Sequence, residues 1–167
     1  FAVTRVIFIP QGEFVTFGAL TLAFLVNKQV PGTMYLLLVA GALVFIAEIV
    51  AAVRAQRYAG LWRTALWTLA LPLALYATLP MVLASDFPLW VGVLFSMLIV
   101  VPLGPMLYRL VYQPVVEASV LVLLITSVAV HFALTGLGLF FFGAEGWRTP
   151  AFLTGQLDIF GESWSAQ

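Results

Sequence analysis

Charged side chains are scarce in this sequence. Asp, Glu, Lys and Arg make up 8% of the 167 residues, whereas hydrophobic residues make up 63%, and the mean hydropathy is +1.13. A soluble domain carries about a quarter charged residues, which cover its surface with groups that water solvates. So few charges cannot cover a chain of this length, and the composition therefore excludes an ordinary soluble fold.

Cysteine is absent, and the few charges are balanced in sign. Without cysteine the chain has neither a disulfide framework nor a cysteine-based metal site. Seven Lys and Arg against seven Asp and Glu leave no basic surface, so we expect no nucleic-acid partner. The sequence also lacks a Walker A loop, HExxH, GxSxG and a dinucleotide fingerprint. We therefore expect no cofactor, no bound metal and no enzymatic activity.

Long hydrophobic runs are what the chain has instead. The hydrocarbon layer of a bilayer is about 30 Å thick, so a spanning helix needs about 20 mostly apolar residues. Five runs meet or approach that length: Phe14–Val26, Gly32–Val53, Thr64–Ala84, Phe87–Leu107 and Ser119–Phe142. They do not alternate as barrel strands do, and every backbone polar group must be satisfied inside lipid. The predicted fold is all-α, a polytopic transmembrane helix bundle with about five spans.

The chain divides into two predicted regions. Residues 1–143 form the transmembrane region, which we expect to be a fragment of a longer polypeptide, and residues 144–167 form an external loop. In that loop, Ala151–Leu153 and Leu157–Phe160 are expected to pair as a short hairpin.

Basic residues indicate which way the spans run. The connections that alternate to one side contain five arginines, whereas the other side has two basic residues, Lys28 and Arg148. Cytoplasmic loops carry an excess of Lys and Arg, so the arginine-rich side is predicted to face the cytoplasm. The five arginines are Arg5, Arg54, Arg57, Arg63 and Arg109.

The segment Pro10-Gln11-Gly12-Glu13 interrupts an apolar stretch. Proline removes a helix hydrogen bond, so the segment predicts an interrupted helix near Pro10–Gly12, of the kind from which transporters build solute sites. An interfacial turn before a helix explains the same residues equally well, with Glu13 favoured at the helix N-terminus.

Two polar positions lie inside predicted spans. His131 is the only histidine, and Thr126, Ser127 and Thr135 share a possible helical stripe with it. This stripe either lines a polar path or holds a neutral histidine that bonds a neighbouring helix. Glu48 is expected to extend toward the headgroups near Arg54 rather than face the interior. The candidate solute path consists of Gln11, Gly12, Glu13, Thr126, Ser127, His131 and Thr135.

Two stretches resemble the permease subunit of Liv-type ABC importers, the branched-chain amino acid transporters. Residues 8–14, followed by Phe17-Gly18-Ala19, are similar to the family's Asn-Phe-Ala-His-Gly-Glu-Phe and its later Gly-Ala or Gly-Ser. Residues 108–114, then Ala118-Ser119 and residues 124–126, are similar to Glu-Arg-Leu-x-Tyr-Arg-Pro, a small-residue turn and Leu-Ile-x-Thr-x-Gly. Pro10, Gln11, Gln113 and Val128 depart from these patterns, and Gly32–Ala84 adds two spans where the family has one helix.

The resemblance implies the N-terminal portion of an importer for branched-chain or related small amino acids, amides or urea. It implies a second related permease, cytoplasmic ATP-binding subunits, an external substrate-binding protein and surrounding membrane lipid as partners. It also implies a multi-pass location in the bacterial plasma (inner) membrane. A non-transporting assembly or scaffold subunit is an alternative. So is an intramembrane enzyme in which His131 would pair with Glu13 or Glu48 and activate Ser127.

Overall fold

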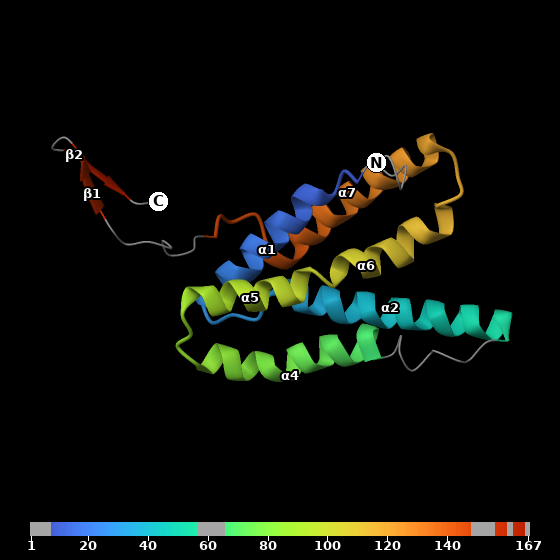
Figure 1. The fold of residues 1–167 in the computed structure, drawn as a ribbon, viewed down its shortest axis with the longest axis horizontal. Helices are drawn as coiled ribbons and strands as arrows, with labels where there is room; N and C mark the ends of the chain where they lie inside the picture. The colour runs from blue at the N-terminus through green and yellow to red at the C-terminus, as the bar shows by residue number, and fades with distance from the viewer. Residues whose placement is uncertain (1–7, 57–65, 148–155, 160–161, 166–167) are drawn as a thin grey trace.

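The computed structural model describes residues 8–56, 66–147, 156–159 and 162–165, and Figure 1 shows its helices side by side. The first half contains α1 (Gln11–Val26), α2 (Gly32–Ala55), the π-helical η1 (Leu66–Ala70) and α4 (Leu71–Ala84). The second half contains α5 (Leu89–Val100), α6 (Leu103–Leu107), the π-helical η2 (Tyr108–Tyr112), the 3-10 turn η3 (Gln113–Val115) and α7 (Val120–Phe142). Two strands follow, β1 (Gln156–Ile159) and β2 (Glu162–Ser165).

Four helical stretches are long and apolar enough to cross a membrane: Gly32–Ala55, Leu66–Ala84, Leu89–Val115 and Val120–Phe142. The prediction of a helical bundle of membrane-spanning type is thereby confirmed. The count of about five spans is not confirmed, because α1 has 16 residues. At 1.5 Å per residue it is about 24 Å long, less than the hydrocarbon thickness of about 30 Å.

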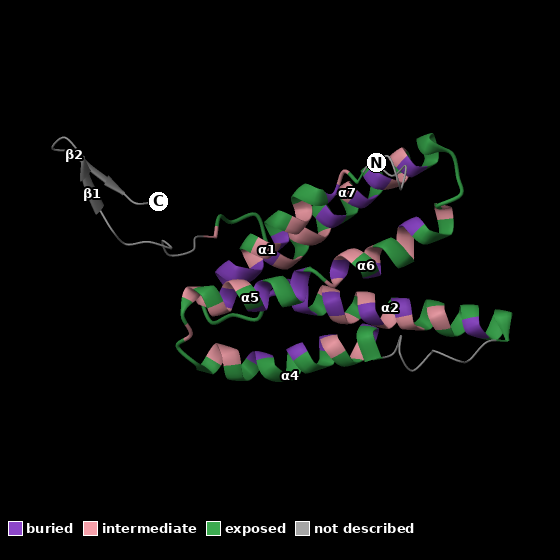
Figure 2. Ribbon diagram, viewed as in Figure 1, coloured by how far each residue is buried: buried purple, intermediate pink, exposed green. Residues whose placement is uncertain are grey.

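The outward faces of the long helices are apolar. Figure 2 shows exposed residues along α2, α4 and α7, and the exposed positions include large hydrophobic side chains such as Ile46, Met81 and Phe140. In water such faces would be costly, because each apolar surface left exposed forgoes the hydrophobic stabilisation of burial. In lipid they face a matching solvent.

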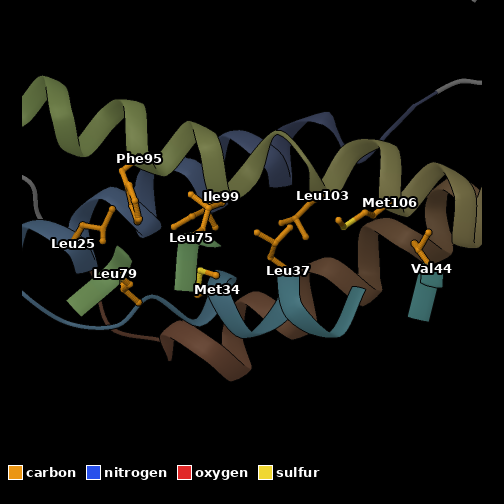
Figure 3. Close-up of a cluster of buried hydrophobic side chains, with 10 residues drawn as sticks. All are labelled: Leu25, Met34, Leu37, Val44, Leu75, Leu79, Phe95, Ile99, Leu103 and Met106. Atoms are coloured by element: carbon orange, nitrogen blue, oxygen red, sulfur yellow. The ribbon is translucent and has the colours of Figure 1, made fainter. Parts of the chain in front are cut away.

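Two clusters of buried side chains hold the helices together. Figure 3 shows the first, which runs from Leu25 and Leu79 at one end to Met106 and Val44 at the other and joins α1, α2, α4, α5 and α6. The second is more aromatic and joins α1 and α7 to α5 and η2. Its buried members are Phe17, Phe24, Val100, Tyr112, Val130, Leu134 and Phe142.

The helix that begins at Leu89 continues further than the sequence predicts. Its predicted end was Leu107, and residues 109–118 were assigned to a connection, yet helical structure persists to Val115. Pro114 lacks the N–H that an α-helix needs, but the backbone passes through π-helical and 3-10 hydrogen bonding around it. The extension keeps Arg109 on a helix that packs beside α2.

The helix α1 starts level with the middle of α7. It lies beside α7 and runs in the same direction, because Glu13 contacts His131 near one end and Phe24 contacts the Phe142 ring near the other. His131 is midway along α7, so the first turn of α1 lies level with the centre of a spanning helix. The described residues 8–10 before it are not helical. What precedes them lies outside the described residues, so the predicted interruption is seen from its C-terminal side alone.

The tail forms a hairpin of β1 and β2, whereas the sequence predicts a hairpin of residues 151–153 with residues 157–160. Leu157 pairs with Trp164 and Ile159 with Glu162 in an antiparallel register. The expected partner strand, residues 151–153, lies outside the described residues.

Candidate functional site between α1 and α7

Two ionisable side chains from different helices meet between α1 and α7. The Nδ1 atom of His131 lies 2.6 Å from Oε1 of Glu13, and the two side chains are 37% and 16% exposed. This is an ion-pair distance, but the contact lacks hydrogen-bond geometry. Within the described residues, Nδ1 of His131 and the second carboxylate oxygen of Glu13, Oε2, are buried without a hydrogen-bond partner. Oε2 of Glu13 therefore retains unused hydrogen-bonding capacity, whereas Oε1 of Glu13 occupies the approach to Nδ1 of His131.

Local sequence places both groups. Pro10 precedes the first turn of α1 and offers no capping side chain, so the free N–H groups of that turn favour an acid, and Glu13 supplies it. On the other helix, Ser119 caps α7 by accepting a hydrogen bond from the Val122 N–H. Aromatic contacts of Phe24 with Phe142 and Trp147 then fix the register of α1 against α7.

A cleft of about 260 Å³ lies beside the pair. Glu13 and Thr135 line it from the two helices, together with Thr16 and the small residues Gly138 and Gly143. Glycine at position 138 leaves a surface without a side chain next to Phe17. The cleft therefore offers a carboxylate, hydroxyl groups and free space, which is what a small polar solute needs for binding.

The predicted polar stripe on α7 does not form one lining. Ser127 is fully buried and its hydroxyl lies 3.1 Å from that of Tyr112, whereas Thr135 is exposed and bonds the carbonyl of His131. Residues four apart on an α-helix are offset by about 40° around the helix axis. Ser127, His131 and Thr135 therefore turn step by step from the core toward the surface. Thr126 bonds the carbonyl of Val122 in its own helix.

Of the residues predicted at the α1 end, one enters the site. Glu13 reaches His131, whereas Gln11 and Gly12 are exposed, and the Gly12 carbonyl accepts a hydrogen bond from the Thr16 hydroxyl. The structure thus joins Glu13, His131 and Thr135 and leaves Ser127 and Thr126 outside the cleft.

Glu48 has a different partner from the one expected. Its carboxylate Oε1 lies 2.8 Å from Nη1 of Arg109, not beside Arg54. Arg54 is six residues further along α2, which turns it about 240° around the axis to another face. Arg109 was missed because the sequence assigned it to a loop. The signal that could have found it is that both residues lie near the arginine-rich ends of their spans.

Sequence reasoning also missed the bond between Tyr112 and Ser127. It connects η2 to α7 inside the aromatic cluster, and Ser127 is thereby engaged away from His131. Within the described part of the chain, no group of three or more His, Asp or Glu gathers that could hold a metal ion.

Comparison of the chain with protein-family models, with curated proteins and with solved structures found no match. The resemblance to Liv-type permeases therefore depends on the two sequence stretches alone, within residues 8–19 and 108–126. Its first stretch forms the start of α1, and its second runs through η2 and η3 into α7. The two stretches meet in space, because Glu13 contacts α7 and the Phe8 ring contacts that of Tyr112.

Proposed function

We propose that the chain is part of the membrane-spanning permease of an ATP-driven importer, and that its solute is a branched-chain or related small amino acid, or an amide such as urea. The observation that carries the proposal is a helix that begins level with the middle of the apolar helix α7, with an acid against the only histidine of the chain. Ionisable residues are costly inside a membrane, and they usually mark solute or ion pathways.

The start of α1 supplies two kinds of binding group. Its first-turn N–H groups have no side-chain cap, and a helix N-terminus attracts negative charge such as a carboxylate. The unused oxygen of Glu13 accepts hydrogen bonds from an ammonium or amide group. An amino acid or an amide carries groups of these kinds, and transporters place solute sites at helices that start within the membrane.

ATP would be hydrolysed elsewhere in the complex. The solute then moves because outward-facing and inward-facing states bind it differently. The contact between Glu13 and His131 is the polar connection between α1 and α7 whose rearrangement would alter the cleft. The enzyme alternative is less well supported, since Ser127 bonds Tyr112 and not His131.

The test is uptake by membrane vesicles that contain the full-length gene product, its partner permease and the ATP-binding subunits, with leucine, valine and urea as solutes. ATP-dependent accumulation of one of them should require this subunit. His131→Leu and Glu13→Gln should reduce uptake, while the complex still assembles. Phe140→Leu is the control, since Phe140 is 80% exposed on α7.

Unchanged uptake in both variants would contradict the assignment of the path. If a verified, folded complex accumulates none of a broad panel of solutes, the transport proposal fails and a scaffold role is favoured instead.

A further inference from the structure

A second polar site lies at the arginine-rich end of the bundle, away from Glu13 and His131. Arg109, on η2, is shared by two neighbouring clefts that differ in character. The first, about 480 Å³, is lined by apolar side chains apart from Thr68 and Arg109 itself, and Trp67 and Val101 form part of its wall. The second, about 380 Å³, contains Glu48, Arg109 and Gln113. A cleft with a mostly apolar wall thus adjoins one that contains an ion pair, and Arg109 and Val44 line both.

We propose that these two clefts bind one phospholipid with a zwitterionic, primary-ammonium headgroup, a phosphatidylethanolamine. The lipid phosphate would accept hydrogen bonds from Arg109, the ammonium would donate to Glu48, and one acyl chain would occupy the apolar cleft. This inference concerns the lipid around the protein and does not depend on the transport proposal.

The charges favour this headgroup over others. Arginine has five N–H donors, and the contact with Glu48 goes through Nη1, so donors remain for a phosphate. The pair itself is neutral overall, and a headgroup with one negative and one positive group matches it. An anionic headgroup would meet the charge of Glu48 without a compensating cation, and a choline headgroup has no N–H to donate to the carboxylate.

The depth of the site fits a lipid of the leaflet at that end. Trp67 lies at the start of the span Leu66–Ala84 and is 68% exposed, and tryptophan favours the headgroup level. Arg109 lies near the end of the span Leu89–Val115. Val44 is further from the end of α2 than Glu48 and lines both clefts. The apolar cleft therefore extends from the headgroup level toward the membrane centre, as an acyl chain does.

The exposure of the site allows lipid to reach it. Arg109 is 46% exposed and Glu48 is 32% exposed at the side chain, although both are partly covered by helix α2 and its neighbours. Long basic side chains at such positions direct their charged ends toward the interface, and basic pockets between membrane helices bind lipid headgroups.

The experiment is native mass spectrometry of the full-length protein in detergent micelles, with phosphatidylethanolamine, phosphatidylglycerol or phosphatidylcholine added separately. The wild type should retain phosphatidylethanolamine several-fold more than either of the others. Val101→Phe fills the apolar cleft and leaves the ion pair intact, so it should reduce the retained lipid several-fold. Leu98→Phe is the matched control, because Leu98 is an exposed leucine on the same helix that lies outside the cleft.

A second variant tests the headgroup. Glu48→Gln keeps the shape of the side chain but removes its charge, so phosphatidylethanolamine retention should fall to the level of phosphatidylcholine. The melting temperature of each variant reports whether it is folded. Equal retention by folded Val101→Phe and wild type, or stronger retention of phosphatidylglycerol than of phosphatidylethanolamine, would overturn the inference.

Discussion

The two halves of the bundle hold their polar groups in different ways. In the half built on α2, α4, α5, α6 and η2, Arg109 donates a hydrogen bond of 2.8 Å to the Glu48 carboxylate. In the half formed by α1 and α7, Glu13 lies 2.6 Å from His131 without hydrogen-bond geometry. The first pair is hydrogen-bonded, and the second is a close contact alone.

The closeness of the backbone packing also differs. In the half built on α2, this helix approaches η1 so closely that a Cβ on Gly41 would collide with the backbone carbonyl of Thr68. On α7, a Cβ on Gly136 would meet no atom within 4 Å. The comparison teaches that the close packing of α2 on η1 acts as a frame, whereas a cleft of about 260 Å³ lies beside the contact between α1 and α7.

The largest expected effect comes from breaking the frame. Gly41→Leu forces α2 away from η1, and a backbone carbonyl cannot move aside as a flexible side chain does. Ordinary overpacking costs about 1–3 kcal/mol, and we expect this substitution to exceed that range in the free energy of unfolding. Reversible unfolding in mixed micelles measures it.

The control for this prediction is Gly136→Leu on the other half. The position faces open space in a helix interior, where replacing glycine stabilises by up to about 1 kcal/mol. The two variants should therefore change stability in opposite directions. Equal destabilisation by both would show that the two halves are packed alike.

A smaller effect sharpens the contrast between the two ion pairs. Double-mutant cycles with Glu48→Leu and Arg109→Leu should give a coupling free energy of about 1–3 kcal/mol, because removing either partner leaves an uncompensated charge in a partly apolar site. The cycle with Glu13→Leu and His131→Leu should give less than about 1 kcal/mol, since this contact contains no hydrogen bond for either substitution to break.

The readout is again the free energy of unfolding, measured for each single and double variant at neutral pH. Restored stability in the double variant at positions 48 and 109 is the expected sign of a hydrogen-bonded ion pair. A larger coupling for Glu13 with His131 than for Glu48 with Arg109 would contradict this contrast between the two contacts.

Much of the helix pattern could be predicted from the sequence. The runs Gly32–Val53 and Ser119–Phe142 agree closely with α2 and α7, because Pro31 and Gly143 mark clear boundaries next to long apolar segments. The end of the fourth span could not be predicted. Pro114 normally stops a helix, and a single sequence does not show that π and 3-10 hydrogen bonds let the helix continue.

The site could be predicted in part. Glu13 and His131 were each recognisable as polar residues in apolar surroundings, but their contact depends on the register of α1 against α7. That register arises from aromatic packing between distant segments, which sequence spacing does not reveal. The partner predicted for Glu48 was wrong for the same reason. Helical periodicity alone argues against Arg54, but it does not tell which helix lies beside α2.

The smallest expected effect comes from an ion pair outside both halves, where loops face water. Nζ of Lys28 lies 2.6 Å from Oδ1 of Asp86, and the Asp86 side chain is 94% exposed. The hydrogen bond and charge of Lys28 lower the pKa of Asp86 below its usual value of 3.8. A carboxyl with a lowered pKa in the folded state stabilises the fold above its unfolded pKa, and this contribution is lost as the pH falls through the folded pKa.

Asp86→Asn should therefore lower the melting temperature slightly at neutral pH, less so in high salt, and not at all once wild-type Asp86 is protonated. Melting curves of both proteins across this pH range test it. A difference that persists below the folded pKa would mean that Asp86 stabilises the loops through its shape rather than its charge.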